Sequence, residues 1–266
     1  MKKVLIVGST GFIGSYLSNY LSSCYVVSCI DKNNVDVLNT NHLSTYLKQN
    51  KFNVVINCLT FGGKENVNSF DSKFVEKNFT LFYNFYINSE HYDLFVNIGS
   101  GAEFDKTTNI DLVKENEIFS KHPKEAYGFF KNSLARIINN QKKFTTLRLF
   151  GCFGKDEPSM RLLKRYQQQH LQIADRYIDF FSVQDFARVV KHVVDNNIDG
   201  VDINCVYPDK IKISEFLSLY DTINKRQSNF TITSLDDKNY TGDSSLLSAL
   251  GVKLDGLDYG LGNYNV

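Results

Sequence analysis

Tyr127 and Lys131 stand four residues apart at the start of a segment with helical spacing, residues 127–138. On a helix, residues i and i+4 share one face, with Cβ atoms about 5–6 Å apart. A lysine ammonium at that distance is expected to lower the pKa of the phenol and to hold a ribose, so that the phenol exchanges a proton nearer neutral pH. The spacing therefore predicts acid–base chemistry at Tyr127, although the same pattern in an arbitrary helix would be a solvated face.

Ser100 follows an apolar run, residues 94–98 (LFVNI), that reads as a buried strand. A serine at the carboxyl end of a strand can hydrogen-bond a substrate oxygen in the crevice outside a parallel sheet. The alternative is a cap or turn residue, which is the commoner role of a serine after a strand. We predict Ser100, Tyr127 and Lys131 as the catalytic group, and Ser100, Gly101, Ala102 and Tyr127 as substrate contacts.

Gly8, Gly11 and Gly14 separate a short aliphatic run, residues 4–7, from a helical pattern. Strand, glycine turn and helix in this order form a phosphate cradle: the first glycine permits the turn, the second lets a pyrophosphate approach, and the third packs helix on strand. The helix N-terminus then offers N–H groups and a positive dipole end to the phosphates. The predicted dinucleotide contacts here are Gly8, Thr10, Gly11, Phe12, Ile13 and Gly14.

Asp31 ends the second apolar run, residues 25–30, where an acidic side chain can accept hydrogen bonds from ribose hydroxyls. This mildly favours NAD(H), but Lys32 follows at once and would suit a 2′-phosphate, so NADP(H) stays open; Asp31 could also simply cap a turn. Asp36 is placed to reach the adenine amino group. Further predicted contacts are Val37 beside it and, after the strand at residues 53–58, Cys58, Leu59, Thr60, with Tyr127 and Lys131 completing the cofactor set.

Composition excludes several classes of protein. The chain has 266 residues and a net charge of +1, so no basic surface indicates a nucleic acid partner. No apolar stretch is long enough to span a bilayer, and the short run after Lys2 and Lys3 is unlike a signal peptide. The five cysteines and five histidines are scattered, which predicts reduced thiols, a cytoplasmic location and no metal site.

Alternating strands and helices up to residue 150 predict an α/β fold, a Rossmann-type doubly wound parallel sheet. We place the dinucleotide-binding domain at residues 1–154, with 178–206 returning to it, and a smaller α/β substrate-binding region at 155–266. Residues 35–37 are expected to form a short strand, 106–121 a loop with a helical turn, 177–183 a strand, and 256–266 a loosely ordered tail. Helices are expected at residues 42–49, 70–89, 127–138, 160–170, 184–195, 214–223 and 244–250.

These motifs together resemble the extended short-chain dehydrogenase/reductase superfamily, in its NAD-dependent epimerase/dehydratase group acting on nucleotide-sugars. The matching stretches are GSTGFIG at residues 8–14, Ser100, the Y-x-x-x-K pair, RLFGCFG at 148–154, IDFFSVQDFARVV at 178–190 and YTGDSSLLSALGV at 240–252. The resemblance implies a nicotinamide cofactor, a nucleotide-sugar substrate, and a homodimer formed through the helices at 70–89 and 127–138.

Departures from the family pattern narrow the chemistry that the resemblance implies. Dehydrating members carry an Asp-Glu pair where this chain has Gly101 and Ala102, and members that also epimerise beside the ketone carry a cysteine at the second place. What remains is reduction of a 4-keto sugar or 4-epimerisation. The compact spacing resembles the 4-keto reductases related to dTDP-4-dehydrorhamnose reductase and GDP-fucose synthase, so we favour a reductase that serves surface-glycan synthesis, over an epimerase or a non-catalytic cofactor-sensing module.

Two family contacts to the substrate are also replaced here, by Gly151 and Ile178. Arg161 or Arg176 would then supply the contacts to the nucleotide diphosphate. Arg161 lies in a basic helical stretch, residues 160–170, which could equally face solvent.

Overall fold

The computed structural model describes residues 1–31, 34–62, 72–236 and 238–265. Its centre is a six-stranded sheet in which every neighbouring pair is parallel, in the order β10-β6-β4-β3-β1-β2. The strands are β1 (Lys3–Val7), β2 (Val26–Ile30), β3 (Val54–Asn57), β4 (Leu94–Ser100), β6 (Phe144–Leu149) and β10 (Val201–Cys205). The predicted α/β fold with a Rossmann-type sheet is confirmed.

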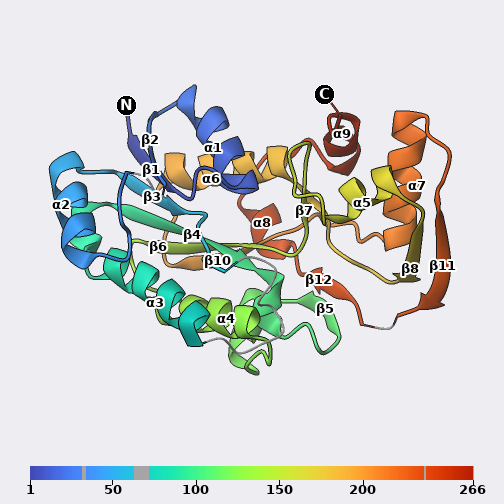
Figure 1. The fold of residues 1–266 in the computed structure, drawn as a ribbon, viewed down its shortest axis with the longest axis horizontal. Helices are drawn as coiled ribbons and strands as arrows, with labels where there is room; N and C mark the ends of the chain where they lie inside the picture. Colours follow the sequence, from blue (N-terminus) through green and yellow to red (C-terminus); the bar gives the residue numbers. More distant parts are fainter. Residues whose placement is uncertain (32–33, 63–71, 237, 266) are drawn as a thin grey trace.

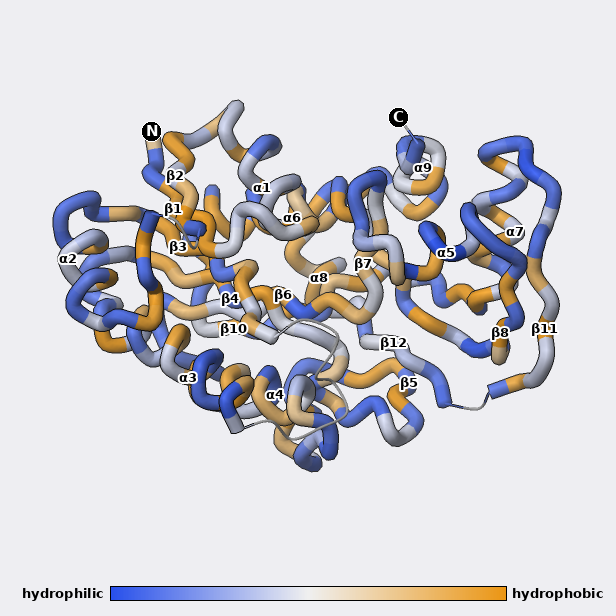
Figure 2. The backbone as a smooth tube through the Cα atoms, viewed as in Figure 1, coloured by the Kyte–Doolittle hydropathy of each residue, from blue (hydrophilic) through white to orange (hydrophobic). Residues whose placement is uncertain are grey.

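Helices cover both faces of this sheet (Figure 1). On one face lie α1 (Phe12–Ser22) and α6 (Val183–Asn196), and on the other α2 (Thr40–Asn50), α3 (Ser72–Tyr86) and α4 (Ala126–Ile138). Alternate residues of β1 divide between the faces: Val4 and Ile6 pack with α1 and α6, whereas Leu5 and Val7 pack with α2 and α3. This alternation explains why β1 is apolar on both faces, as the orange tube at its label in Figure 2 shows.

A second group of elements lies beside the carboxyl ends of the strands, on the right of Figure 1. The helices α5 (Leu162–Gln168), α7 (Ile213–Asn224) and α9 (Leu257–Gly262) pack around a parallel pair, β8 (Leu171–Asp175) and β11 (Phe230–Leu235). Two more pairs connect this group to the sheet: β7 (Cys152–Phe153) with β9 (Phe181–Ser182), and β5 (Ile110–Val113) with β12 (Tyr240–Gly242). The short helix α8 (Ser245–Ala249) follows β12.

The polypeptide returns from this second group to the sheet through α6 and β10, which pairs with β6. Residues 178–206 thus supply a helix and an edge strand to the Rossmann unit. The domain limits at residues 154 and 155 stay a proposal. No helix in the described ranges combines the length and the apolar content that crossing a bilayer requires.

Four local predictions were wrong in whole or in part. Residues 35–37 form no strand: residues 35 and 36 are irregular and a turn follows at 37–38, where Asp36 Oδ1 accepts a hydrogen bond from Leu38 N–H. The loop expected at 106–121 contains the strand β5, which was not predicted, whereas its expected helical turn is present as the 3-10 segment η4 (Glu115–Phe119); another 3-10 segment, η3 (Gly101–Phe104), precedes this loop. The expected strand at 177–183 is reduced to β9. The chain end at 256–265 is ordered as α9 and its C-cap, with Leu261 and Tyr264 fully buried against α7.

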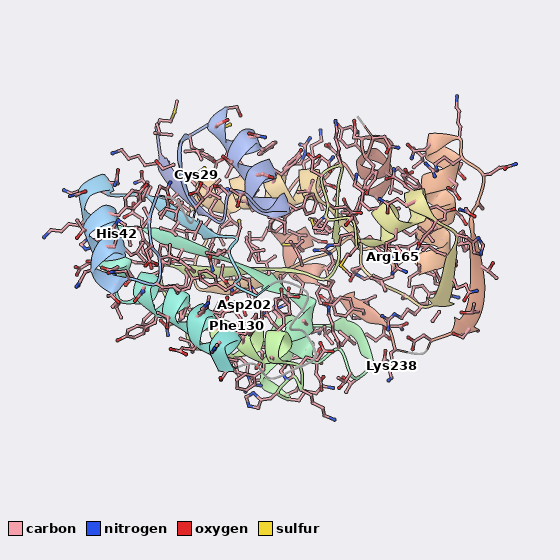
Figure 3. The ribbon with its side chains drawn as sticks, in the orientation of Figure 1. Cys29, His42, Phe130, Arg165, Asp202 and Lys238 are labelled. Carbon is pink, nitrogen blue, oxygen red and sulfur yellow. The ribbon has the colours of Figure 1, made fainter. Side chains whose placement is uncertain are left out.

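The buried ion pair between Glu103 and Arg148 fixes the loop after β4. Arg148 Nε lies 2.5 Å from Glu103 Oε2, and Arg148 Nη2 lies 3.0 Å from Asp202 Oδ2. Arg148 and Glu103 are fully buried, and Asp202, which is labelled in Figure 3, is buried as well. Burial raises the pKa of Glu103, and the Arg148 guanidinium opposes that shift. Since Glu103 also accepts the N–H of Ser100 at 2.8 Å, the pair holds Ser100 in place.

Candidate active site

A cavity of about 350 Å³ opens at the carboxyl ends of the central strands. Its lining residues come from the end of β4, the first turns of α1 and α4, and the segment between β6 and α5. Ser100, Tyr127 and Lys131 all line it, as do Ile13, Cys58 and Thr60. The three residues predicted to be catalytic, which lie up to 31 positions apart, therefore share one cavity wall.

Ser100 is the last residue of β4 and the N-cap of η3. Its side chain is 8% exposed, and its Oγ accepts a hydrogen bond from Ala102 N–H at 3.2 Å. It is a capping residue that also lines the cavity; its hydrogen bond to a substrate oxygen stays a prediction.

Lys131 lies one helical turn after Tyr127 on α4, and its Nζ is 6.0 Å from the centre of the Tyr127 ring. Nζ donates a hydrogen bond to Ile98 O at 2.8 Å. Burial lowers the pKa of Lys131 to about 8, although Glu103 opposes the shift. The ammonium is thus held at the cavity wall by a strand carbonyl.

The expected lowering of the Tyr127 pKa by Lys131 was wrong for the unliganded protein. Burial raises the pKa of Tyr127, while a hydrogen bond from Ser100 and the charge of Arg161 act in the lowering direction. The helical spacing predicted the proximity of the two side chains correctly, but burial is the largest influence on the pKa of the phenol. The phenol is therefore protonated at neutral pH, ready to donate.

Two of the three cradle glycines are required by the fold itself. Gly8 has φ +82°, and a Cβ there would lie 2.9 Å from the Leu59 backbone. A Cβ on Gly14 would lie 2.2 Å from Gly8 O. Gly11 differs: its backbone is extended, and a Cβ would meet only Gly8 O at an ordinary 3.5 Å. Since packing does not explain its missing side chain, the space at Gly11 fits a pyrophosphate, as does the α1 N-terminus, whose N-cap Gly11 has no capping side chain.

Replacing Gly11 by alanine is expected to weaken dinucleotide binding roughly tenfold to a hundredfold while leaving the protein folded. The added methyl group occupies the approach to the phosphates and touches little of the protein. The dissociation constant, measured by fluorescence titration, and the melting temperature together check this. Gly14→Ala is the matched comparison, since it should destabilise the fold. Wild-type affinity in Gly11→Ala would show that the glycine cradle is not part of the dinucleotide-binding site.

The other predicted cofactor contacts lie in several places. Cys58 and Thr60 line the cavity, and Leu59 packs beside Gly8. Asp31 directly follows β2, where the ribose position was predicted. Lys32 lies outside the described residues.

Asp36 is exposed in its turn, and Val37 is buried with its carbonyl accepting a hydrogen bond from Asn84. Thr10 is exposed at the turn before α1, and Phe12 packs toward Gly154. These contacts to a dinucleotide stay predictions.

The two arginines predicted for the substrate lie in different places. Arg161, the N-cap of α5, lines the cavity, and its buried Nε has no hydrogen-bond partner among the described residues. Arg176 does not line this cavity; its Nη1 lies 3.0 Å from Asp236 Oδ2, and its side chain is 32% exposed. Of the two, Arg161 is therefore the residue that the cavity offers to an anionic substrate.

Three residues of this region were missed from sequence. Lys106 and Glu125 line the cavity, and the Lys106 ammonium lies 4.9 Å from the centre of the Tyr240 ring. Burial lowers the pKa of Lys106, and the charge of Glu125 opposes the shift. The sequence contained a signal for two of these residues. Glu125 stands two residues before Tyr127, and Tyr240 is the first residue of the stretch that resembles a sugar-binding segment. Only the fold brings these residues together.

A parallel sheet with a glycine cradle at β1, and a Ser, Tyr and Lys group at one cavity, defines the class of Rossmann-type dinucleotide-binding proteins. A family model for the NAD dependent epimerase/dehydratase family matches residues 4–205, and the chain belongs to that family. This confirms the resemblance and the expected nicotinamide cofactor. No curated protein matches the sequence.

Solved structures share the fold across nearly the whole chain. A GDP-mannoheptose C4 reductase from Campylobacter jejuni, with NADP bound, superposes with a TM-score of 0.83 at 18% identity, covering 99% of this chain and 97% of that one. A UDP-glucuronic acid 4-epimerase from Bacillus cereus, in complex with UDP-glucuronic acid and NAD, gives 0.76 at 20% identity, covering 99% and 98%. A dTDP-glucose 4,6-dehydratase from Bacillus anthracis gives 0.78 at 16%, covering 100% and 96%.

Proposed function

We propose that this protein is an NAD(P)H-dependent reductase of a nucleotide-activated 4-keto-6-deoxy hexose or heptose, acting in surface-glycan biosynthesis in the cytoplasm. The observation that carries the proposal is the meeting of Ser100, Tyr127 and Lys131 at one cavity. The Tyr127 phenol is protonated at neutral pH at its ordinary pKa, which burial raises further. A reductase needs that protonated form at the start of its reaction.

A bound, reduced nicotinamide would supply the hydride that reduces the carbonyl carbon. Tyr127 gives its phenolic proton to the carbonyl oxygen as negative charge develops there, and Ser100 donates a hydrogen bond to the same oxygen. Lys131, which donates a hydrogen bond to Ile98 O at the cavity, would hold the ribose next to the nicotinamide. Arg161 contacts the diphosphate, and Asp31 contacts the adenosine ribose with a mild preference for NAD(H).

Dehydration is disfavoured by the loop after β4. Gly101 and Ala102 have no group that transfers protons. The next residue, Glu103, is fully buried and engaged by Arg148 and by Ser100 N–H. The loop therefore supplies no carboxylate to remove a proton from the sugar.

A nucleotide-sugar 4-epimerase is the closest rival, because it uses the same three residues. An epimerase begins by oxidising the sugar, so its tyrosine must first accept a proton as the phenolate. The raised pKa of Tyr127 works against that state in the unliganded protein. The fold similarity to the C4 reductase from C. jejuni supports the proposal of a reductase. The fold similarity to the 4-epimerase from B. cereus means that the experiment must also test for epimerisation.

The proposed assembly is a homodimer formed through α3 and α4. Both helices carry large apolar side chains at the surface, with Tyr83 58% exposed on α3 and Ile137 41% exposed on α4. Such residues on neighbouring helices suit a self-complementary interface.

The proposal is tested by a panel of nucleotide-linked 4-keto sugars with NADH and NADPH in separate reactions. Oxidation of either coenzyme, coupled to formation of a 4-hydroxy sugar, supports it. Interconversion of 4-hydroxy nucleotide-sugars without net coenzyme consumption would replace it with the epimerase.

Activity is expected to fall as the pH rises through about 8, because Lys131 loses its charge there. Burial has lowered its pKa, so the ammonium is present below about pH 8 and neutral above it, whereas Tyr127 stays protonated throughout this range. The profile of kcat/KM for the coenzyme reports groups of the unliganded enzyme, and it should decline about tenfold per pH unit on the alkaline side. A flat profile between about pH 7 and about pH 9.5 would contradict the role of Lys131.

A further inference from the structure

Two charged side chains that line the catalytic cavity, Lys106 and Glu125, make no hydrogen bond or ion pair among the described residues. Their charges are opposite, yet they do not pair with each other. Pairing would be the simplest way to offset the loss of hydration that two charges incur at a cavity wall. Because the protein leaves both groups unpaired at one cavity, both are available to a ligand.

The two residues flank a close contact between η3 and the first turn of α4. Lys106 lies just after η3, and Glu125 is the N-cap of α4. A Cβ on Gly128 would lie 2.6 Å from Ala102 O, which is closer than a side chain permits, so the two elements pack backbone against backbone. The positions of Lys106 and Glu125 in the chain are therefore fixed relative to each other by packing.

Both residues lie beside the groups that are proposed to act on the carbonyl. Glu125 stands two residues before Tyr127. The Lys106 ammonium lies 4.9 Å from the centre of the Tyr240 ring. That ring borders the loop after β4, since a Cβ on Gly101 would lie 2.7 Å from the Tyr240 hydroxyl oxygen. A sugar whose carbonyl meets the catalytic group in this cavity of about 350 Å³ therefore lies close to both charges.

The chemistry of the two groups indicates what they bind. An ammonium only donates hydrogen bonds and a carboxylate only accepts them, whereas a sugar hydroxyl does both. One hydroxyl can thus accept from Lys106 and donate to Glu125. A carboxylate on the sugar would be attracted by Lys106 but repelled by Glu125, and an amino group would meet the reverse. The pair therefore favours a neutral, hydroxylated sugar.

We propose that Lys106 and Glu125 are specificity-determining residues that together bind the C3 hydroxyl group of a neutral sugar substrate. Lys106 Nζ donates a hydrogen bond to the hydroxyl oxygen, and the Glu125 carboxylate accepts the one that the hydroxyl donates. The inference rests on the proposed function, because in a 4-keto-6-deoxy sugar C3 is the hydroxyl-bearing carbon next to the carbonyl. It is separate from the proposed contact of Arg161 with the diphosphate.

The test compares GDP-, UDP- and dTDP-linked 6-deoxyhexoses with their 3,6-dideoxy counterparts, by calorimetry on the enzyme loaded with coenzyme. Wild type should bind the 3-hydroxy ligand at least about tenfold more tightly than the 3-deoxy ligand. Lys106→Met and Glu125→Ala should each weaken binding of the 3-hydroxy ligand about tenfold and leave that of the 3-deoxy ligand unchanged. Lys124→Met is the matched control, because Lys124 is exposed next to Glu125 and does not line the cavity.

Equal binding of the two ligands by the wild type would overturn the proposal, and so would equal weakening of both ligands in Lys106→Met. With the 4-keto sugar, both variants should raise KM about tenfold and leave kcat nearly unchanged, since neither residue touches the reacting atoms. A preference for the 3-hydroxy ligand without reduction of any 4-keto sugar would refute the proposed function alone. Reduction without that preference would refute only the role of Lys106 and Glu125.

Discussion

Tyr127→Phe is expected to lower kcat for sugar reduction by about 10²–10⁴-fold, the usual contribution of a positioned general acid. The substitution removes only the hydroxyl that supplies the proton and keeps the ring. Lys131 retains its hydrogen bond to Ile98 O, so coenzyme binding should persist. Steady-state kinetics, together with a coenzyme titration of the same variant, measures both effects.

The matched comparison is Tyr83→Phe, which removes a phenolic hydroxyl from an exposed position on α3. It should leave kcat unchanged. Full turnover in Tyr127→Phe would exclude Tyr127 as the acid. Loss of coenzyme binding in that variant would instead point to a structural role for the hydroxyl.

Glu103→Ala is expected to cost about 3–5 kcal/mol of unfolding free energy, because it leaves the Arg148 guanidinium buried without one of its carboxylate partners. Asp202 and Asn204 still contact Arg148, at 3.0 and 3.1 Å, but neither reaches Nε. The Ser100 N–H loses its acceptor as well. Urea denaturation of wild type and variant gives the difference.

Glu117→Ala provides a control with similar local geometry. Glu117 Oε1 accepts the N–H of Lys114 at 2.8 Å at the start of η4, as Glu103 Oε1 accepts that of Ser100, but it is exposed and forms no ion pair with an arginine within the described part of the chain. Its loss should cost about 1 kcal/mol or less. Equal effects of the two substitutions would show that the buried ion pair contributes little.

The parts of the fold that sequence predicted well are those set by local pattern. The strand, glycine turn and helix from Lys3 to Ser22 depend on neighbours in sequence, and the apolar runs of β3, β4, β6 and β10 are long enough to identify. The tail was missed because its glycines favour disorder locally, whereas burial of Leu261 and Tyr264 orders it. The strands β8 and β11 were missed because each is stabilised mainly by the other across an interval of about 60 residues.

The candidate site shows the same limit. Spacing placed Lys131 near Tyr127, but the raised pKa of Tyr127 comes from burial, which no spacing encodes. The Glu103–Arg148 pair spans 45 residues, and Tyr240 reaches the Ser100 loop only because β12 pairs with β5. Contacts between distant segments therefore supply what the motifs leave out.

Transfer of deuterium from labelled coenzyme to the sugar tests the central claim most directly. The enzyme is incubated with the reactive 4-keto nucleotide-sugar and with NADH or NADPH deuterated at the transferable position. We predict one deuterium at C4 of the product for each coenzyme oxidised. A product without deuterium at C4, or sugar turnover with no net oxidation of the coenzyme, would contradict the assignment as a 4-keto reductase.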